Sequence, residues 1–237
     1  MVIIADGVAD EVFDLPVTSK PAVSREKVIN GFAGLTQFLT WPLLFVIFHV
    51  CFSMKISGRE NFRRARGPFI IVSNHIDYYH SFLFRLVLGY FTPHLPLRFM
   101  AVNRFDWPFL NFLARIGFID FLYSLFGVFT ITPGLGLEKN IKKAIEIIKV
   151  GGNIVIYPEG RITREGGIGP FKSGAAAIMQ ATQVDIMPVS FRITGRGWLR
   201  KKLEVHIGGP FCMIPGRSLE EITNSLRKRV VELWEGV

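Results

Sequence analysis

Cysteine is scarce in this sequence of 237 residues, which contains only Cys51 and Cys212. Two cysteines cannot build a disulfide framework, and by themselves they cannot form a zinc site. We therefore expect two reduced, inert thiols in a reducing compartment. Internal repeats and low-complexity segments are also absent, which excludes a repeat architecture.

Charged residues are missing from the stretch 28–54, which has no Asp, Glu, Lys or Arg and is dense in Phe, Leu, Ile and Val from residue 38 onward. A bilayer is crossed by about 20 apolar residues, so the stretch is long enough. Pro42 interrupts it, and polar residues and glycines such as Asn30, Gly31 and Gln37 dilute its first half. Three interpretations stay open: a single span, a bent pair of half-helices dipping into one leaflet, and a buried core helix.

A secretory signal is not expected at Met1, because the first residues are acidic where a signal peptide is basic. We predict a loosely ordered arm over 1–27, a membrane-associated helical segment or hairpin over 28–54, and an α/β domain over 55–237. Basic residues follow the apolar stretch directly, which predicts contact with anionic head groups at the cytoplasmic face of the cell membrane. These residues are Lys55, Arg59, Arg63, Arg64 and Arg66.

Positive charge exceeds negative charge in the chain, with 28 Lys and Arg against 19 Asp and Glu and a formal net charge of +9. A basic protein attracts anionic partners: nucleic acid, an anionic membrane surface or phosphorylated substrates. Hydrophobic residues make up 49% of the sequence and the mean hydropathy is +0.34. Basicity together with this apolar character favours a membrane surface, and no basic-aromatic pattern typical of nucleic-acid binding occurs.

Strand-like and helix-like segments alternate after residue 66, which predicts a largely parallel sheet covered by helices on both faces. The expected strands are 69–72, 98–102, 128–131, 154–157, 186–191 and 203–207. The expected helices are 81–91, 107–115, 141–149, 171–182 and an amphipathic helix from residue 218. Gly151 is expected to end the helix 141–149 in a left-handed conformation, and Ser218 with Glu221 forms a capping box.

Ionisable side chains follow two of these strands, and ligands of open α/β sheets bind at the carboxyl ends of strands. His75 comes after strand 69–72; at a helix start its ring would stay neutral and could accept a proton. Asp77 could fix the tautomer of that ring. The alternative from these residues alone is an ordinary turn in which Asp77 is an N-cap.

A second polar turn follows strand 154–157, and its most informative residue is Arg161. An arginine beside Gly160 in such a turn can hold a phosphate through two parallel hydrogen bonds. Glu159 could hold that guanidinium or cap the turn. Lys172, Arg164 and Arg104 could add positive charge for binding the phosphate.

Four motifs occur in order along the chain: Asn74-His75, Pro158-Glu159-Gly160-Arg161, Pro170-Phe171-Lys172-Ser173-Gly174 and Met187-Pro188-Val189. Over residues 55 to about 215 the chain resembles the glycerophospholipid acyltransferases, whose best-known members are the lysophosphatidic acid acyltransferases. The resemblance implies that the histidine of a His-x4-Asp motif deprotonates a lysophospholipid hydroxyl, which attacks the thioester of acyl-CoA or acyl carrier protein. It implies no metal and no cofactor, and an N-terminal helical hairpin on the membrane, similar to 28–54 here.

The resemblance and the residue chemistry together predict His75, Asp77 and His80 as catalytic residues. Six further residues are predicted to bind the substrate: Asn74, Arg104, Glu159, Gly160, Arg161 and Lys172.

His80 departs from the family pattern, because it stands where the His-x4-Asp motif has its aspartate. Asp77 could orient His75 from a shifted position, His80 could act as a hydrogen-bonded partner, or catalysis could be impaired. A second departure is Thr132-Pro133, where the family has an arginine. The apolar stretch 121–126 could deepen membrane contact or line an acyl tunnel.

Two competing functions follow from these departures. His75, Asp77 and His80 have the donor types and close spacing of a metal-dependent hydrolase, although His94 and His206 lack supporting acids. The other competing function is a lipid-binding protein without turnover.

Overall fold

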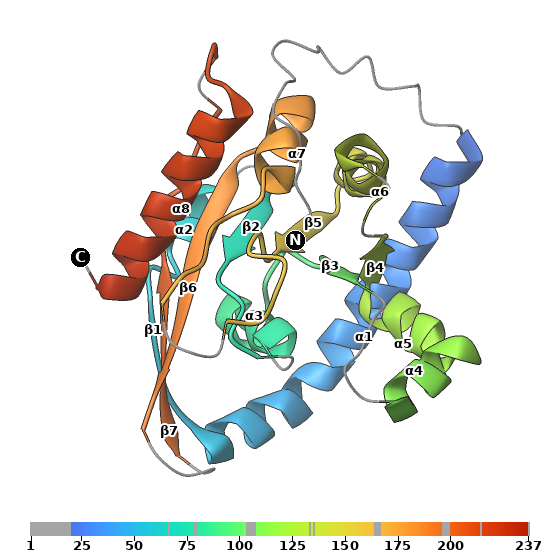
Figure 1. Ribbon diagram of the computed structural model, residues 1–237. Helices are drawn as coiled ribbons and strands as arrows, with labels where there is room; N and C mark the ends of the chain where they lie inside the picture. The colour runs from blue at the N-terminus through green and yellow to red at the C-terminus, as the bar shows by residue number, and fades with distance from the viewer. Residues whose placement is uncertain are drawn as a thin grey trace.

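A seven-stranded sheet organises the chain in the computed structural model (Figure 1). The structure describes residues 20–65, 67–77, 80–102, 108–132, 134, 136–163, 167–195, 200–213 and 215–236, and of 20–22, 80 and 102 only the backbone. The strands are β1 (Phe52–Ser57), β2 (Ile70–Ser73), β3 (Leu97–Val102), β4 (Val128–Ile131), β5 (Asn153–Ile156), β6 (Ile186–Thr194) and β7 (Lys201–Ile207). Their order is β1-β7-β6-β2-β5-β3-β4, and all neighbours are parallel except β6 and β7. The predicted, mostly parallel α/β fold is confirmed.

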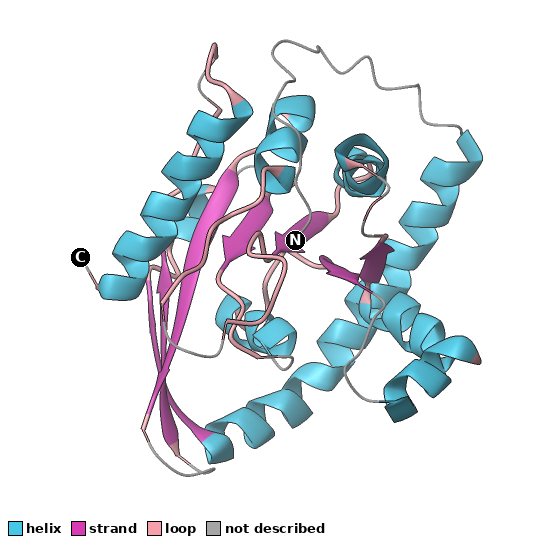
Figure 2. Ribbon diagram, in the orientation of Figure 1, coloured by secondary structure: helices cyan, strands magenta, loops and turns pink. Residues whose placement is uncertain are grey.

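Helices cover both faces of this sheet (Figure 2). They are α1 (Lys20–Cys51), α2 (Asn61–Arg64), α3 (His80–Leu88), α4 (Pro108–Arg115), α5 (Phe118–Phe126), α6 (Leu137–Lys149), α7 (Gly174–Thr182) and α8 (Leu219–Glu235). Ile70 and Val72 pack with α6, α7 and α8 on one face, whereas Ile71 packs with α3 and the end of α1 on the other. Because both faces are buried, β2 is a continuous apolar run without alternation.

Two predicted helix ends are confirmed, whereas the helix predicted over 81–91 ends at Leu88 and the helix predicted over 171–182 begins at Gly174. The amide of Glu221 donates to the hydroxyl of Ser218 at 3.2 Å, and the amide of Ser218 donates to the Glu221 carboxylate at 2.8 Å, so the predicted capping box is confirmed. Gly151 follows α6 with φ of +88°, the left-handed conformation expected there.

Strand β1 lies where the sequence analysis expected the end of the membrane segment and a basic patch for head groups. Residues 52–57 instead pair in parallel with β7, a partner far along the chain that local patterns do not reveal. The guanidinium of Arg59, predicted to face lipid, donates to the carbonyls of Leu86 and Val87 and so caps the end of α3. The predicted domain boundary at residue 55 therefore falls inside a strand.

Helix α1 begins before the predicted boundary at residue 28 and continues to Cys51 as one helix, not as two half-helices. Pro42 lies inside it, and a proline there removes one helix hydrogen bond and bends the axis. Figure 1 shows α1 changing direction along its length as it crosses the molecule.

The polar side of α1 faces the protein. The carboxylate of Glu26 is fully buried and pairs with the guanidinium of Arg98 at 3.1 Å and with the ammonium of Lys143. Arg98 also donates to Asn30 at 2.6 Å, and the side chain of Gln37 bonds the backbone of β3. Buried polar groups on α1 thus find partners on the domain beneath them.

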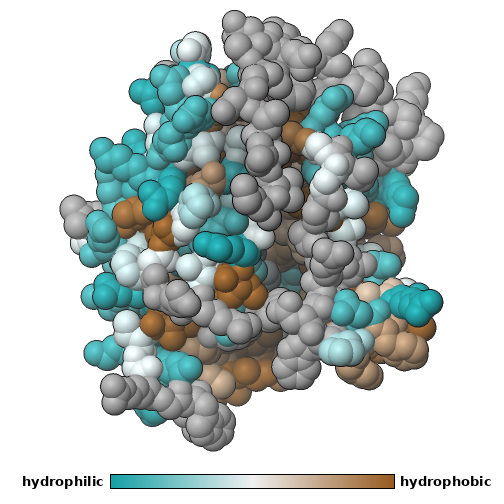
Figure 3. Space-filling view, in the orientation of Figure 1, coloured by the Kyte–Doolittle hydropathy of each residue, from teal (hydrophilic) through white to brown (hydrophobic). Residues whose placement is uncertain are grey.

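The apolar side of α1 faces outward and forms a continuous stripe at spacings of three or four residues. We call it the outer stripe; its members are Val28, Phe32, Leu35, Leu39, Leu43, Val46 and Val50. Leu39 and Leu43 are 65% and 63% exposed, so the interpretation of 28–54 as a buried core helix is wrong. Among the described residues α1 is the helix long and apolar enough to cross a membrane. Further apolar surface lies on α4 and α5 and along the lower edge of the molecule in Figure 3.

Candidate active site

Two loops at the carboxyl ends of neighbouring strands form the site. The loop 74–77 follows β2, and the loop 157–163 follows β5, which pairs with β2. The amide of His75 donates to Glu159 Oε1 at 3.2 Å, and the amide of Thr163 donates to the carbonyl of His75 at 2.8 Å. Both backbone groups of His75 are therefore held by the second loop.

Glu159 organises this pair of loops. Its side chain is 5% exposed, and its second carboxylate oxygen accepts from the Thr163 hydroxyl and from the amide of Gly169 at 3.3 Å. A buried carboxylate needs such donors to offset its desolvation. Of the two roles that the sequence left open for Glu159, these hydrogen bonds fit the cap of a turn and not a contact with Arg161. Glu159 was also predicted to bind substrate, but its described hydrogen bonds go to the loops themselves and give it a positioning role.

Asn74 also positions the site from within. It is fully buried, its amide group donates to the carbonyl of Phe191 at 2.9 Å, and its Oδ1 accepts from the amide of Phe191 at 2.9 Å. The side chain thereby imitates a strand and extends the pairing between β2 and β6 by one step. Asn74 was predicted to bind substrate; instead it fixes the start of the His75 loop.

The His75 ring lies flat against Tyr157, with ring centroids 4.1 Å apart and an interplanar angle of 14°. Tyr157 is in turn within hydrogen-bonding distance of the Ser81 hydroxyl, at 3.3 Å. Burial lowers the pKa of His75 from 6.5 to about 4, against an opposing effect of the Asp77 carboxylate. The ring is neutral at physiological pH, as predicted, but because it is desolvated and not because of a helix dipole: α3 begins only at His80.

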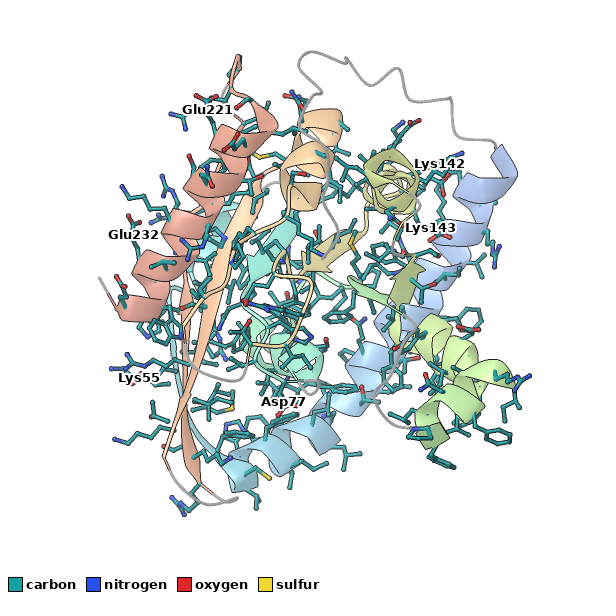
Figure 4. The ribbon with its side chains drawn as sticks, viewed as in Figure 1. Lys55, Asp77, Lys142, Lys143, Glu221 and Glu232 are labelled. Atoms are coloured by element: carbon teal, nitrogen blue, oxygen red, sulfur yellow. The ribbon has the colours of Figure 1, made fainter. Side chains whose placement is uncertain are left out.

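The Asp77 carboxylate is close enough to His75 to raise its pKa. The interpretation in which Asp77 orients His75 from a shifted position requires this proximity. In Figure 4 it lies below β2, in the lower half of the molecule. His80 is the first residue of α3, but its side chain lies outside the described residues, as do Arg104 and Arg164.

Positive charge borders the second loop. Gly160 has φ of +65°, and a β-carbon there would lie 2.8 Å from Lys172 Nζ, so the lysine side chain packs over this glycine. The amide of Lys172 donates to the carbonyl of Pro158 at 2.9 Å, which anchors the lysine to the loop. Arg161 is the next residue and is exposed. The loop therefore presents two cations beside the residues that hold His75.

Tyr157, Ser81 and Thr163 take part in this site but were missed by sequence reasoning. Tyr157 ends an apolar run, a position equally typical of a core residue, and Ser81 becomes relevant only when α3 packs against β5. Among the side chains that the structure describes, no three His, Cys, Asp or Glu residues gather as metal ligands.

The chain is similar to known proteins. The family model for acyltransferases matches residues 53–192, more than half of the chain. The 1-acyl-sn-glycerol-3-phosphate acyltransferase BAT2, chloroplastic, of Brassica napus is 26% identical over 149 residues, covering 60% of this chain and 38% of that protein. LPAT1, chloroplastic, of Arabidopsis thaliana, with the same activity in its name, is 25% identical over 148 residues, covering 61% and 37%. The chain thus spans less than two fifths of the length of these relatives.

A solved structure has the same fold. The crystal structure of the 1-acyl-sn-glycerophosphate (LPA) acyltransferase PlsC from Thermotoga maritima superposes with a TM-score of 0.57 at 21% identity, covering 95% of this chain and 85% of that one. With the motifs at the two strand ends and the match over 53–192, the resemblance predicted from sequence is confirmed, and the chain belongs to the acyltransferase family.

Proposed function

We propose that the protein is a membrane-associated O-acyltransferase that moves a fatty acyl group from the thioester of acyl-CoA or acyl carrier protein to a lysophosphatidic acid-type hydroxyl. The observation that carries the proposal is the neutral imidazole of His75, held through its backbone by the same loop that presents Arg161 and Lys172. Such a loop can bind an anionic acceptor while the ring removes a proton from it. The names of the relatives support this class of acceptor.

The reaction needs one base and one anion-binding group. His75 accepts the hydroxyl proton of the acceptor, and the oxygen forms an ester bond to the thioester carbonyl carbon. The carbon–sulfur bond breaks, and the leaving thiolate takes the proton from the imidazolium, which restores the neutral ring. Asp77 favours the imidazolium electrostatically, because its effect on the pKa of His75 is upward. Arg161 and Lys172 hold the acceptor phosphate.

The membrane is the source of the acceptor in this proposal. The outer stripe of α1 exposes apolar side chains while the opposite side of the helix is bonded to the domain. Helix α1 contacts β1, α3, α5 and α6, so it runs along the domain and does not leave it as a separate span. We infer that it lies in one leaflet, at the cytoplasmic face, with the site at the membrane surface.

The test is thioester consumption by the purified full chain in phospholipid vesicles, followed as free thiol release. Turnover is expected to require a lysophosphatidic acid acceptor. His75→Ala should reduce the rate by a factor of about 10²–10⁴, the usual contribution of a general base. His206→Gln, on strand β7, is the matched histidine control and should retain activity. Absence of turnover with every acyl donor would reject the proposal and favour a lipid-binding protein.

A further inference from the structure

A groove lies beside the His75 loop, on the side of strand β6. Strand β2 ends at Ser73, paired with Val189, whereas β6 continues to Thr194. Beyond the end of β2, a cavity of about 450 Å³ opens between the loop 74–77, the extension of β6, the start of β7 and the end of α8. Its lining includes Asp77, Arg192, Ile193, Lys201 and Trp234, together with Gly167 from the loop after β5.

Among the residues that the structure describes, no strand pairs with the extension of β6 on its β2 side beyond Ser73, so this edge faces the groove. Asn74 bonds both the amide and the carbonyl of Phe191, so these two groups point to the β2 side. Backbone groups of a strand alternate between its two edges, which places the amide and carbonyl of Ile193 on the same side. A ligand that carries amide groups can pair with such an edge as an added strand does.

The groove is lined by residues of opposite charge. Asp77 lies at the end next to His75, and its carboxylate disfavours an anionic group there. Arg192 and Lys201 lie on the extension of β6 and on β7, and the Arg192 guanidinium carbon is 5.1 Å from the centre of the Trp234 ring. An elongated ligand is therefore expected to place its anionic end at Arg192 and Lys201 and its other end near His75.

The strand order places Arg192 of this groove and the cations of the acceptor-binding loop on opposite sides of β2. Arg161 and Lys172 belong to the loop after β5, and β2 lies between β5 and β6 in the sheet. Two anion-binding positions therefore flank the His75 loop. A transferase with two substrates that both carry phosphate needs such a pair of positions.

We propose that this groove binds the phosphopantetheine arm of the acyl donor. This inference rests on the proposed function, because it assumes that the donor is a thioester. The arm carries two amide groups, a phosphate at one end and the thioester sulfur at the other. Its amides pair with the free edge of β6 at Ile193, its phosphate contacts Arg192 and Lys201, and its thioester reaches the His75 end. Residues 191–195 of the strand span about 13 Å, a length suited to an extended chain.

Acyl-CoA and acyl carrier protein share this arm, so the experiment uses both together with an acyl thioester of pantetheine that lacks the phosphate. The variant is Arg192→Gln/Lys201→Gln, and the matched control is Lys202→Gln, which removes a neighbouring charge outside the groove lining. For the variant, KM for both phosphate-bearing donors should rise about tenfold or more, the usual effect of losing a charged hydrogen bond. The KM for lysophosphatidic acid, and the KM for the phosphate-free donor, should not change.

The possible results separate the two proposals. If the wild type turns over but the variant keeps its donor KM, the groove assignment is wrong and the acyltransferase proposal stands. If the KM of the variant rises for only one of the two phosphate-bearing donors, or rises for the acceptor instead, the phosphopantetheine assignment is also overturned. If the wild type shows no turnover, calorimetric binding of CoA decides: affinity lost in the variant and kept in Lys202→Gln supports the groove, and equal affinity contradicts it.

Discussion

His75 and Tyr157 form a parallel ring pair at the centre of the candidate site, with centroids 4.1 Å apart. Tyr157 extends directly from β5, so the platform under the imidazole belongs to the rigid sheet. The backbone of His75 is fixed independently by Glu159 and Thr163. The ring and the backbone of His75 are thus both oriented by the segment that follows β5. The chain has His80 at the position where the His-x4-Asp motif has its aspartate.

Removing the platform should disturb the orientation of the base. Tyr157→Leu should lower kcat about three- to tenfold, because an aromatic pair contributes about 0.5–1.5 kcal/mol beyond burial. Tyr157→Phe keeps the stacking and loses only the contact with Ser81, so it should lose less than Tyr157→Leu. Initial rates at saturating donor measure the effect, and circular dichroism controls for folding. Equal losses in both variants would assign the role to the hydroxyl and contradict the platform.

The pH dependence of activity should reveal the desolvated base. The pKa of His75 is lowered to about 4, so the neutral, proton-accepting ring persists well below 6.5. We expect the acid limb of kcat/KM to fall near pH 4 and not near pH 6.5. In Asp77→Asn the upward effect of the carboxylate is removed, so the limb should move to still lower pH while kcat falls. An acid limb near 6.5 in the wild type would contradict the burial of the ring.

The same group should make stability depend on pH. The folded-state pKa of His75 lies below its unfolded value, so the unfolded chain binds more protons between pH 4 and 6.5. This contribution is fully present above pH 6.5 and is lost as the pH falls towards 4, up to about 3 kcal/mol. Urea unfolding of the wild type and of His75→Gln at pH 7.5 and 5 measures it. The difference in unfolding free energy between the two pH values should be smaller in the variant.

Glu159 should matter for both folding and activity, because three donors depend on its buried carboxylate. Glu159→Ala should lower the free energy of unfolding by about 2–4 kcal/mol and reduce kcat, since buried donors lose their partner. Glu159→Gln keeps one acceptor oxygen, so its free energy of unfolding and its kcat should lie between those of the wild type and those of Glu159→Ala. Glu60→Gln, at an exposed glutamate, is the control and should be neutral. Glu159→Ala with wild-type stability would mean that the loops hold their conformation without this carboxylate.

The location of the site could be predicted from sequence, but the roles of several of its residues could not. Apolar runs before His75 and before Tyr157 identify two strands, and in a parallel sheet their carboxyl ends meet at one edge. Asn74 and Glu159 are polar residues in polar turns, so the sequence suggests contact with substrate. Their burial results from pairing with Phe191 and from enclosure by loop residues up to Gly169, which only tertiary packing creates.

Helix α1 illustrates a different limit. Glu26, Asn30 and Gln37 lie on one side of the helix and are buried. From the sequence, Asn30 and Gln37 seemed only to dilute an apolar segment, and Glu26 fell in the predicted arm 1–27. The periodicity is present in the sequence, but it does not say which side packs against the protein. A water-soluble core would bury the apolar side. The structure buries these polar residues, together with Ala33 and Phe48, and leaves the outer stripe exposed, as expected where the surrounding medium is lipid.

The outer stripe should therefore drive membrane binding without contributing to the fold. Leu39→Asn/Leu43→Asn should reduce partitioning onto anionic phospholipid vesicles by about a hundredfold or more, because each buried leucine contributes about 1.5–3 kcal/mol. The free energy of unfolding in detergent should stay within about 0.5 kcal/mol of wild type, since both side chains already face outward. The control exchanges an exposed ion pair on α8, Lys228→Asn/Glu232→Asn, which leaves the net charge unchanged. Vesicle co-sedimentation measures the partitioning, and binding unaffected by the leucine exchange would assign the membrane contact to a surface other than α1.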